Sequence, residues 1–178
     1  RAAPGQGEER WVLAQRGLAA AWLLLSELEP RPPEAPTRRT ALLRTEATYQ
    51  ALLEAGQRDE AIYAGHGWTA IQLGAWDQAR GPLAAAAELA PDDPTYPALQ
   101  GLAAWLNSTR YPTAQFPGAF ASTINDALEA YTRVIALGQG DLSRTYATRS
   151  LMYFNLRTIP RGETFAAADF DARMLAAI

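Results

Sequence analysis

The sequence predicts an all-α chain whose helices pack in antiparallel pairs. Apolar residues recur at helical spacing in long stretches, and proline or glycine separates these stretches. Gly67 and Gly101 occupy equivalent places in successive stretches and lie 34 residues apart, which is the length of a helix–turn–helix repeat unit. The pattern predicts eight helices in four pairs, at Glu8–Leu28, Thr37–Glu54, Asp59–Leu73, Asp77–Leu89, Tyr96–Asn107, Ala119–Leu137, Leu142–Leu156 and Glu163–Ile178.

The first pair is predicted over about residues 8–55. Residues 29–36, EPRPPEAP, separate its two helices, because proline lacks a backbone N–H and blocks the turn that precedes it. Gly56 ends the second helix. The first helix is indicated by apolar residues at helical spacing, namely Trp11, Leu18, Trp22 and Leu25.

Three more pairs are predicted over about residues 59–90, 95–137 and 142–178. In the second pair an aspartate opens each helix, at Asp59 and Asp77, and Gly74 closes the first of them. The third pair contains a second proline-bearing insertion, STRYPTAQFPG at residues 108–118. Both insertions join the two helices of one pair, and repeat proteins often place such insertions on one face.

Residues 60–93 resemble a tetratricopeptide (TPR) repeat. Seven residues match the repeat pattern. They are the aromatic residue Tyr63, the small residue Gly67, the turn residue Gly74, Ala79 and Ala86 at the alanine positions, the large apolar residue Leu83 and the terminating proline Pro91. The other units match at fewer positions: Leu13 and Gly17 in the first, Gly101, Ala127, Tyr131 and Val134 in the third, and Tyr146, Ser150, Tyr153, Ala166 and Phe170 in the fourth. The resemblance implies a bacterial TPR-like protein with degenerate repeats: a single domain, residues 1–178, forming a right-handed α-solenoid of about four antiparallel helix pairs.

In TPR proteins the first helix of each pair lines a concave groove that binds a partner. By resemblance, the partner-binding residues of this chain are Trp11, Trp22, Trp68, Ile71, Gln72, Leu102, Trp105, Arg144, Leu151, Phe154 and Asn155. Tryptophan anchors peptides well, since it combines a large apolar surface with a polar N–H. The alternative is that these tryptophans belong to the helix-packing core, and the sequence leaves both interpretations open.

Composition argues against several classes of partner. The net charge of −3 and the pI of about 5.2 do not fit a nucleic-acid-binding surface. The longest apolar run, from Leu18 to Leu25, is far shorter than the ~20 residues that a membrane-spanning helix needs. With no cysteine in the chain, disulfides and cysteine-ligated metals are excluded.

The sequence predicts a protein that binds another protein or peptide and is not an enzyme. It contains no phosphate-binding loop, nucleophile elbow or zinc-binding motif, and we expect no cofactor and no metal. The only histidine, His66, stands where the TPR pattern has leucine, and we expect it to be partly buried and bonded to a backbone group. Arg38, Arg39 and Arg44 are expected to pair with glutamates such as Glu46, or to clamp an acidic motif.

The alternative function is a structural or self-associating subunit of a larger assembly. Its contact surface would be the insertion edge or the apolar face at the C-terminal end, with Met174, Leu175 and Ile178. The compartment stays open between cytoplasm and a bacterial periplasmic or secreted location. The first residue, Arg1, is compatible with a removed signal peptide and equally with a trimmed chain.

Overall fold

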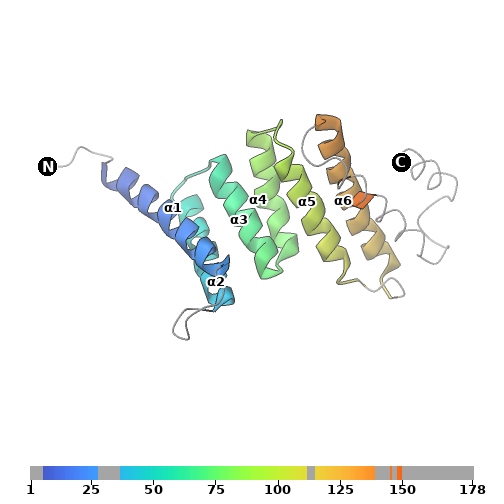
Figure 1. Ribbon diagram of the computed structural model, residues 1–178, viewed down its shortest axis with the longest axis horizontal. Helices are drawn as coiled ribbons and strands as arrows, with labels where there is room; N and C mark the ends of the chain where they lie inside the picture. The colour runs from blue at the N-terminus through green and yellow to red at the C-terminus, as the bar shows by residue number, and fades with distance from the viewer. Residues whose placement is uncertain (1–5, 28–36, 112–114, 139–144, 146–147, 150–178) are drawn as a thin grey trace. The chain divides into compact units, whose positions relative to one another are not determined.

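A computed structural model describes residues 6–27, 37–111, 115–138, 145 and 148–149 of the chain. Within these residues the fold consists of helices without any strand, which confirms the predicted all-α class (Figure 1). The predicted helices at residues 142–178 lie outside the described residues, apart from three isolated positions. The six helices are α1 (Gln6–Glu27), α2 (Arg38–Glu54), α3 (Glu60–Leu73), α4 (Trp76–Leu89), α5 (Thr95–Ser108) and α6 (Pro117–Leu137).

The ends of these helices lie within two residues of the predicted ends, and capping residues fix several of them. Thr37 caps α2 by accepting a hydrogen bond from the Thr40 N–H, and Asp59 caps α3 by accepting one from the Ile62 N–H. Gly74 ends α3 in the left-handed conformation, φ 75°. Asp77 differs from expectation: it lies inside the first turn of α4, where Ala75 is the cap residue and no side chain caps the helix.

The chain divides into two compact units, residues 1–90 and 91–178. In the first unit each helix packs against the next in sequence, so α1 contacts α2, α2 contacts α3 and α3 contacts α4 (Figure 1). In the second unit α5 packs against α6. Consecutive helices joined by short connections pack as antiparallel neighbours, as the predicted pairs require.

Alanine and threonine form much of the core of the first unit, which lets the helices approach closely. Its buried apolar residues are Ala19, Ala41, Leu42, Leu52, Ile62, Ala70, Ile71, Ala79, Leu83, Ala86 and Ala87. The buried hydroxyls of Thr45 and Thr69 donate to the backbone carbonyls of Ala41 and Gly65, one turn earlier. Each therefore satisfies its hydrogen-bonding capacity within its own helix and costs little to bury.

The core of the second unit lies between α5 and α6. It consists of Ala104, Ala121, Ile124, Ala127, Leu128, Tyr131 and Val134, with Ala98, Trp105 and Phe120 packed against it. The residues 127, 131 and 134, which match the repeat pattern, all lie in this core. The pattern therefore marks the face of α6 that packs on α5.

The same helix-packing contact occurs in the α3–α4 and α5–α6 pairs. A Cβ atom built at Gly67 would lie 2.6 Å from Leu83 Cγ, and one built at Gly101 would lie 2.7 Å from Tyr131 Cε2. In both pairs the first helix thus carries a glycine, against which a large side chain of the second helix packs. Gly17 of α1 does not share this contact, since nothing lies within 4 Å of a Cβ there.

Candidate functional site

The described residues of the predicted groove lie on the first helix of three pairs. Trp11 and Trp22 are on α1, Trp68, Ile71 and Gln72 on α3, and Leu102 and Trp105 on α5. Trp68 and Gln72 are neighbours on one face of α3, one turn apart. The other four predicted groove residues, Arg144, Leu151, Phe154 and Asn155, lie outside the described residues.

Burial separates these residues into core and surface. Ile71 is a core residue with 7% of its surface exposed, and Trp105 packs on the α5–α6 core. Trp22 is half-buried beneath the guanidinium group of Arg44 from α2, which lies 4.4 Å from the ring centroid and makes a cation–π contact. Trp68, Gln72 and Leu102 are half-buried, whereas Trp11 is exposed.

Two hydrogen bonds and the packing of Tyr49 on Gly65 form a row of contacts between α2 and α3, and we call this row the α2–α3 polar seam. Its members are Arg38, Glu46 and Tyr49 on α2, with Gly65, His66 and Gln72 on α3. The two helices run antiparallel, so residues late in α2 meet residues early in α3. The seam contains one predicted groove residue, Gln72, whose side-chain oxygen accepts a hydrogen bond from Arg38 Nη2.

His66 and Glu46 form the centre of the seam. His66 Nε2 donates to Glu46 Oε1 over 2.8 Å, and the two side chains are only 16% and 14% exposed. The expected partial burial of His66 is confirmed, but the expected bond to a backbone group is wrong, because the partner is a carboxylate. Glu46 Oε2 and His66 Nδ1 are buried without a hydrogen-bond partner among the described residues.

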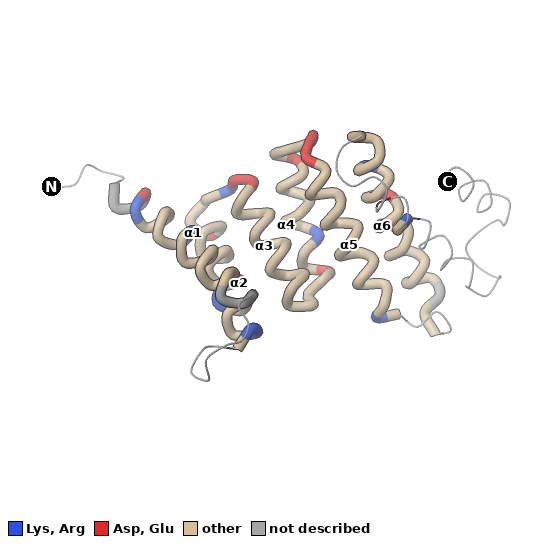
Figure 2. Tube along the Cα trace, in the orientation of Figure 1, with Lys and Arg blue, Asp and Glu red and all other residues tan. Residues whose placement is uncertain are grey.

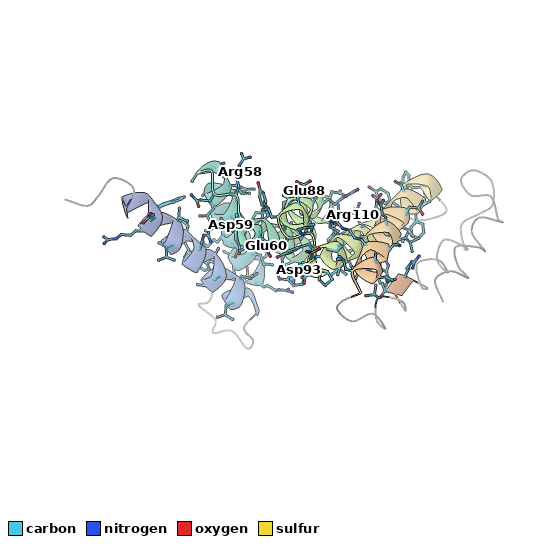
Figure 3. The ribbon with its side chains drawn as sticks, turned by 90° about the horizontal axis from the view of Figure 1, so that it is seen from above. Arg58, Asp59, Glu60, Glu88, Asp93 and Arg110 are labelled. Atoms are coloured by element: carbon cyan, nitrogen blue, oxygen red, sulfur yellow. The ribbon has the colours of Figure 1, made fainter. Side chains whose placement is uncertain are left out.

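The arginines of α2 are exposed, and two of them make contacts that the sequence analysis did not predict. Arg38 donates to Gln72, Arg44 lies over Trp22, and Glu46 is bound to His66. Arg16 of α1 pairs with Asp59, the N-cap of α3, so this carboxylate links two helices as well as capping one. Figure 3 labels Asp59 beside Arg58 and Glu60, at the start of α3.

Tyr49 is the member of the seam that sequence reasoning missed. Its ring lies over Gly65, where any Cβ atom would overlap it. The one available signal was Gly65 itself, a glycine inside a helix that a neighbouring side chain has to approach. Burial removes the Tyr49 hydroxyl from water and raises its pKa above the ordinary value of 10.0.

The raised pKa of Tyr49 predicts a loss of stability in alkali. The fold favours the protonated phenol of Tyr49. The stability that this preference contributes is complete below pH 10, and it is lost as the pH rises through the pKa of the folded state, because the unfolded chain releases its phenol proton at a lower pH. We expect the free energy of unfolding to fall by at most about 1.4 kcal/mol per pH unit from this group. Urea denaturation of wild type and Tyr49→Phe between pH 8 and pH 11 measures it. Equal slopes for both proteins would contradict the prediction.

Charged residues in the first unit gather at helix ends more than along helix bodies (Figure 2). α3 carries a single carboxylate, Glu60, in its first turn, and the rest of its length has no Asp, Glu, Lys or Arg. Among the described residues no three His, Cys, Asp or Glu side chains converge to hold a metal ion. In the same part of the chain, no helix has both the length and the apolar character to cross a bilayer.

Comparison with known proteins identifies no relative: no family model, no curated protein and no solved structure matches this chain. Function must therefore be inferred from the helix pairs and from the residues that they present.

Proposed function

We propose that this chain is a degenerate TPR-like repeat protein, built as an α-solenoid, which binds a segment of another protein. The observation that carries the proposal is the repeated contact of Gly67 with Leu83 and of Gly101 with Tyr131. Both glycines occupy the small position of the repeat, and both partners occupy its large apolar position. The contacts join residues 16 and 30 positions apart in the numbering, and the longer separation includes the insertion at residues 108–118.

In the first unit the proposed binding surface is the face of α3 that carries Trp68 and Gln72, together with Arg38 of α2. An aromatic ring that is half-buried is already held in place, so it loses little conformational freedom when a partner covers it. Arg38 is exposed and lies beside Gln72. Its guanidinium group would bind a carboxylate of the partner through a two-pronged hydrogen bond. The expected partner is therefore a peptide with an apolar side chain close to an acidic residue or a C-terminus.

A displayed random-peptide library, selected on the wild-type protein, tests this function. For the selected peptides we expect Trp68→Ala to weaken binding roughly 30-fold, the effect of removing a central aromatic anchor. Arg38→Gln is expected to weaken binding only of peptides that contain a carboxylate. Leu43→Ala changes an exposed leucine of α2 outside this surface and serves as the matched control. Peptides that bind all four proteins equally would show that the α3 surface is not the site.

A further inference from the structure

The exposed side of α1 is apolar along its whole central length. Every exposed residue between positions 11 and 24 is apolar, and the polar residues of this stretch, Gln15 and Arg16, are half-buried. Four large side chains on this side are strongly exposed: Trp11 by 39%, Leu13 by 72%, Leu18 by 43% and Leu24 by 64%. We call this surface the α1 outer face; it consists of Trp11, Leu13, Ala14, Gly17, Leu18, Ala20, Ala21 and Leu24.

Helical geometry gives the α1 outer face a shape that a second helix fits. Ala14, Gly17 and Ala21 follow one another at spacings of three and four residues, so they form a shallow track along its centre. At 100° per residue, Trp11 and Leu18 lie on one border of the track, and Leu13 and Leu24 lie on the other. Small residues between two ridges of large ones allow close approach of helix backbones.

Gly17 has no explanation within the described fold. Gly65, Gly67 and Gly101 each accommodate a neighbouring side chain, whereas a Cβ at Gly17 would meet nothing within 4 Å. Gly81 of α4 and Gly118 of α6 are open in the same way, but Gly17 lies at the centre of an exposed apolar track. There its missing side chain allows the backbone of a second helix to approach closely.

Charge decides the orientation of such a helix if it is α1 of a second copy. Arg10 is exposed and precedes the track on the same side of the helix. A parallel pair would place the two Arg10 side chains against each other. An antiparallel pair places each Arg10 near the carboxyl end of the other α1, where the helix dipole is negative. The two helix dipoles then point in opposite directions, which is the favourable arrangement.

The apolar area of the face is sufficient for a modest dimer. With side chains of this size each presenting roughly 150–250 Å² when fully exposed, the face offers on the order of 500 Å² per copy. A symmetric pair would then bury about 1,000 Å², the lower bound for a specific interface, so we expect a weak dimer.

We propose that two copies of this chain associate through their α1 outer faces as an antiparallel helix pair, with the two-fold axis beside Leu18. Leu18 of one copy then lies next to Leu18 of the other, Leu13 next to Leu24, and Ala14 across from Ala21. The surface is the same on both copies and complementary to itself, as a two-fold interface requires. It is separate from the proposed peptide-binding surface on α3.

Sedimentation equilibrium over a range of protein concentrations tests the dimer. We expect wild type to change from monomer to dimer as the protein concentration rises, and Leu18→Arg to raise the dissociation constant at least about tenfold, because it buries a charge in the interface. Leu89→Arg, at an exposed leucine of α4, is the matched control and should dimerise like wild type. Wild type that remains monomeric at every concentration, or Leu18→Arg that dimerises normally, overturns the proposal.

Gly17→Leu distinguishes loss of the interface from loss of the fold. The leucine enters open space on the monomer and improves helix propensity, so we expect the thermal midpoint of the dilute monomer to rise by about 1–3 °C. The same side chain fills the track and should raise the dissociation constant at least about tenfold. A Gly17→Leu protein that dimerises as tightly as wild type would contradict the proposed packing.

Disulfide trapping tests the orientation, since the chain has no cysteine of its own. In the antiparallel pair, Ala14→Cys and Ala21→Cys proteins should form a mixed disulfide when they are oxidised together. Each variant oxidised alone should remain largely unlinked, because its two cysteines would be offset by roughly 10 Å along the helices, beyond the reach of a disulfide. Efficient linking of Ala14→Cys to itself would show a parallel pair and overturn the antiparallel arrangement.

Discussion

Replacing Leu83 with alanine is expected to lower the free energy of unfolding by about 3 kcal/mol, since Leu83 is completely buried between α3 and α4. Gly67→Ala is expected to lower it by about 1–2 kcal/mol, although alanine favours a helix by about 1 kcal/mol over glycine. The new Cβ would lie 2.6 Å from Leu83 Cγ and 2.8 Å from Leu83 Cδ2. Urea denaturation of both variants measures the two losses.

The decisive observation is the double variant. Once Leu83 is alanine, the two atoms closest to the Cβ at position 67 are gone. The next is the Ala79 carbonyl oxygen at 3.4 Å, an ordinary contact distance, and the Cβ partly fills the vacated space. In that background Gly67→Ala is therefore expected to be neutral or stabilising by up to about 1 kcal/mol, a reversal of sign. Gly17→Ala, at a glycine without neighbours, should stabilise the monomer in either background and serves as the control. Additive losses in the double variant would show that the glycine does not accommodate Leu83.

The second large effect is expected at the Glu46–His66 pair. His66→Leu introduces a residue suited to helix packing, yet it takes the 2.8 Å partner from a Glu46 carboxylate that is only 14% exposed. We expect a loss of about 2–3 kcal/mol, because an unpaired charge that is largely buried costs more than the new apolar contact contributes. Glu46→Leu alone should be destabilising for the corresponding reason, by about 1–3 kcal/mol.

Replacing both residues by leucine should return the stability to within about 1 kcal/mol of wild type, or above it. Each member of the pair already has one buried polar atom without a hydrogen-bond partner among the described residues, so removing both side chains also removes these unsatisfied atoms. Leucine, in turn, has a volume suited to helix packing. Thermal and urea unfolding of the four proteins complete the cycle. Gln50→Ala removes only a 3.5 Å contact to the same carboxylate and should change stability by less than about 0.5 kcal/mol. If the double variant loses as much free energy of unfolding as the two single variants together, the two residues are not coupled.

The helices could be predicted from the sequence because local interactions decide them. Proline-rich segments, the cap residues Thr37 and Asp59 and the turn at Gly74 act within a few residues of where they stand, so the ends of six helices were predicted to within two residues. Asp77 is the exception that shows the limit of such signals, because a carboxylate favours the whole first turn of a helix and does not by itself define the cap.

The polar seam could not be predicted, because its members lie on different helices. Glu46 and His66 are 20 residues apart, and Arg38 and Gln72 are 34 residues apart. Periodicity indicates that His66 faces inward, but the residue that meets it depends on the angle and register of α2 against α3. Sequence reasoning therefore predicted a buried histidine and assigned it the wrong partner.

The sequence by itself determined the fold class, the helix boundaries and the positions of Gly67 and Gly101, since these depend on backbone chemistry and on spacing along the chain. Only the tertiary structure decided that Leu83 and Tyr131 pack on those glycines, that Arg44 covers Trp22, and that the exposed residues of α1 between positions 11 and 24 are all apolar. The physical reason is that helical spacing in the sequence determines which residues share a face. Whether that face meets another helix or solvent depends on contacts between residues that are distant in the chain.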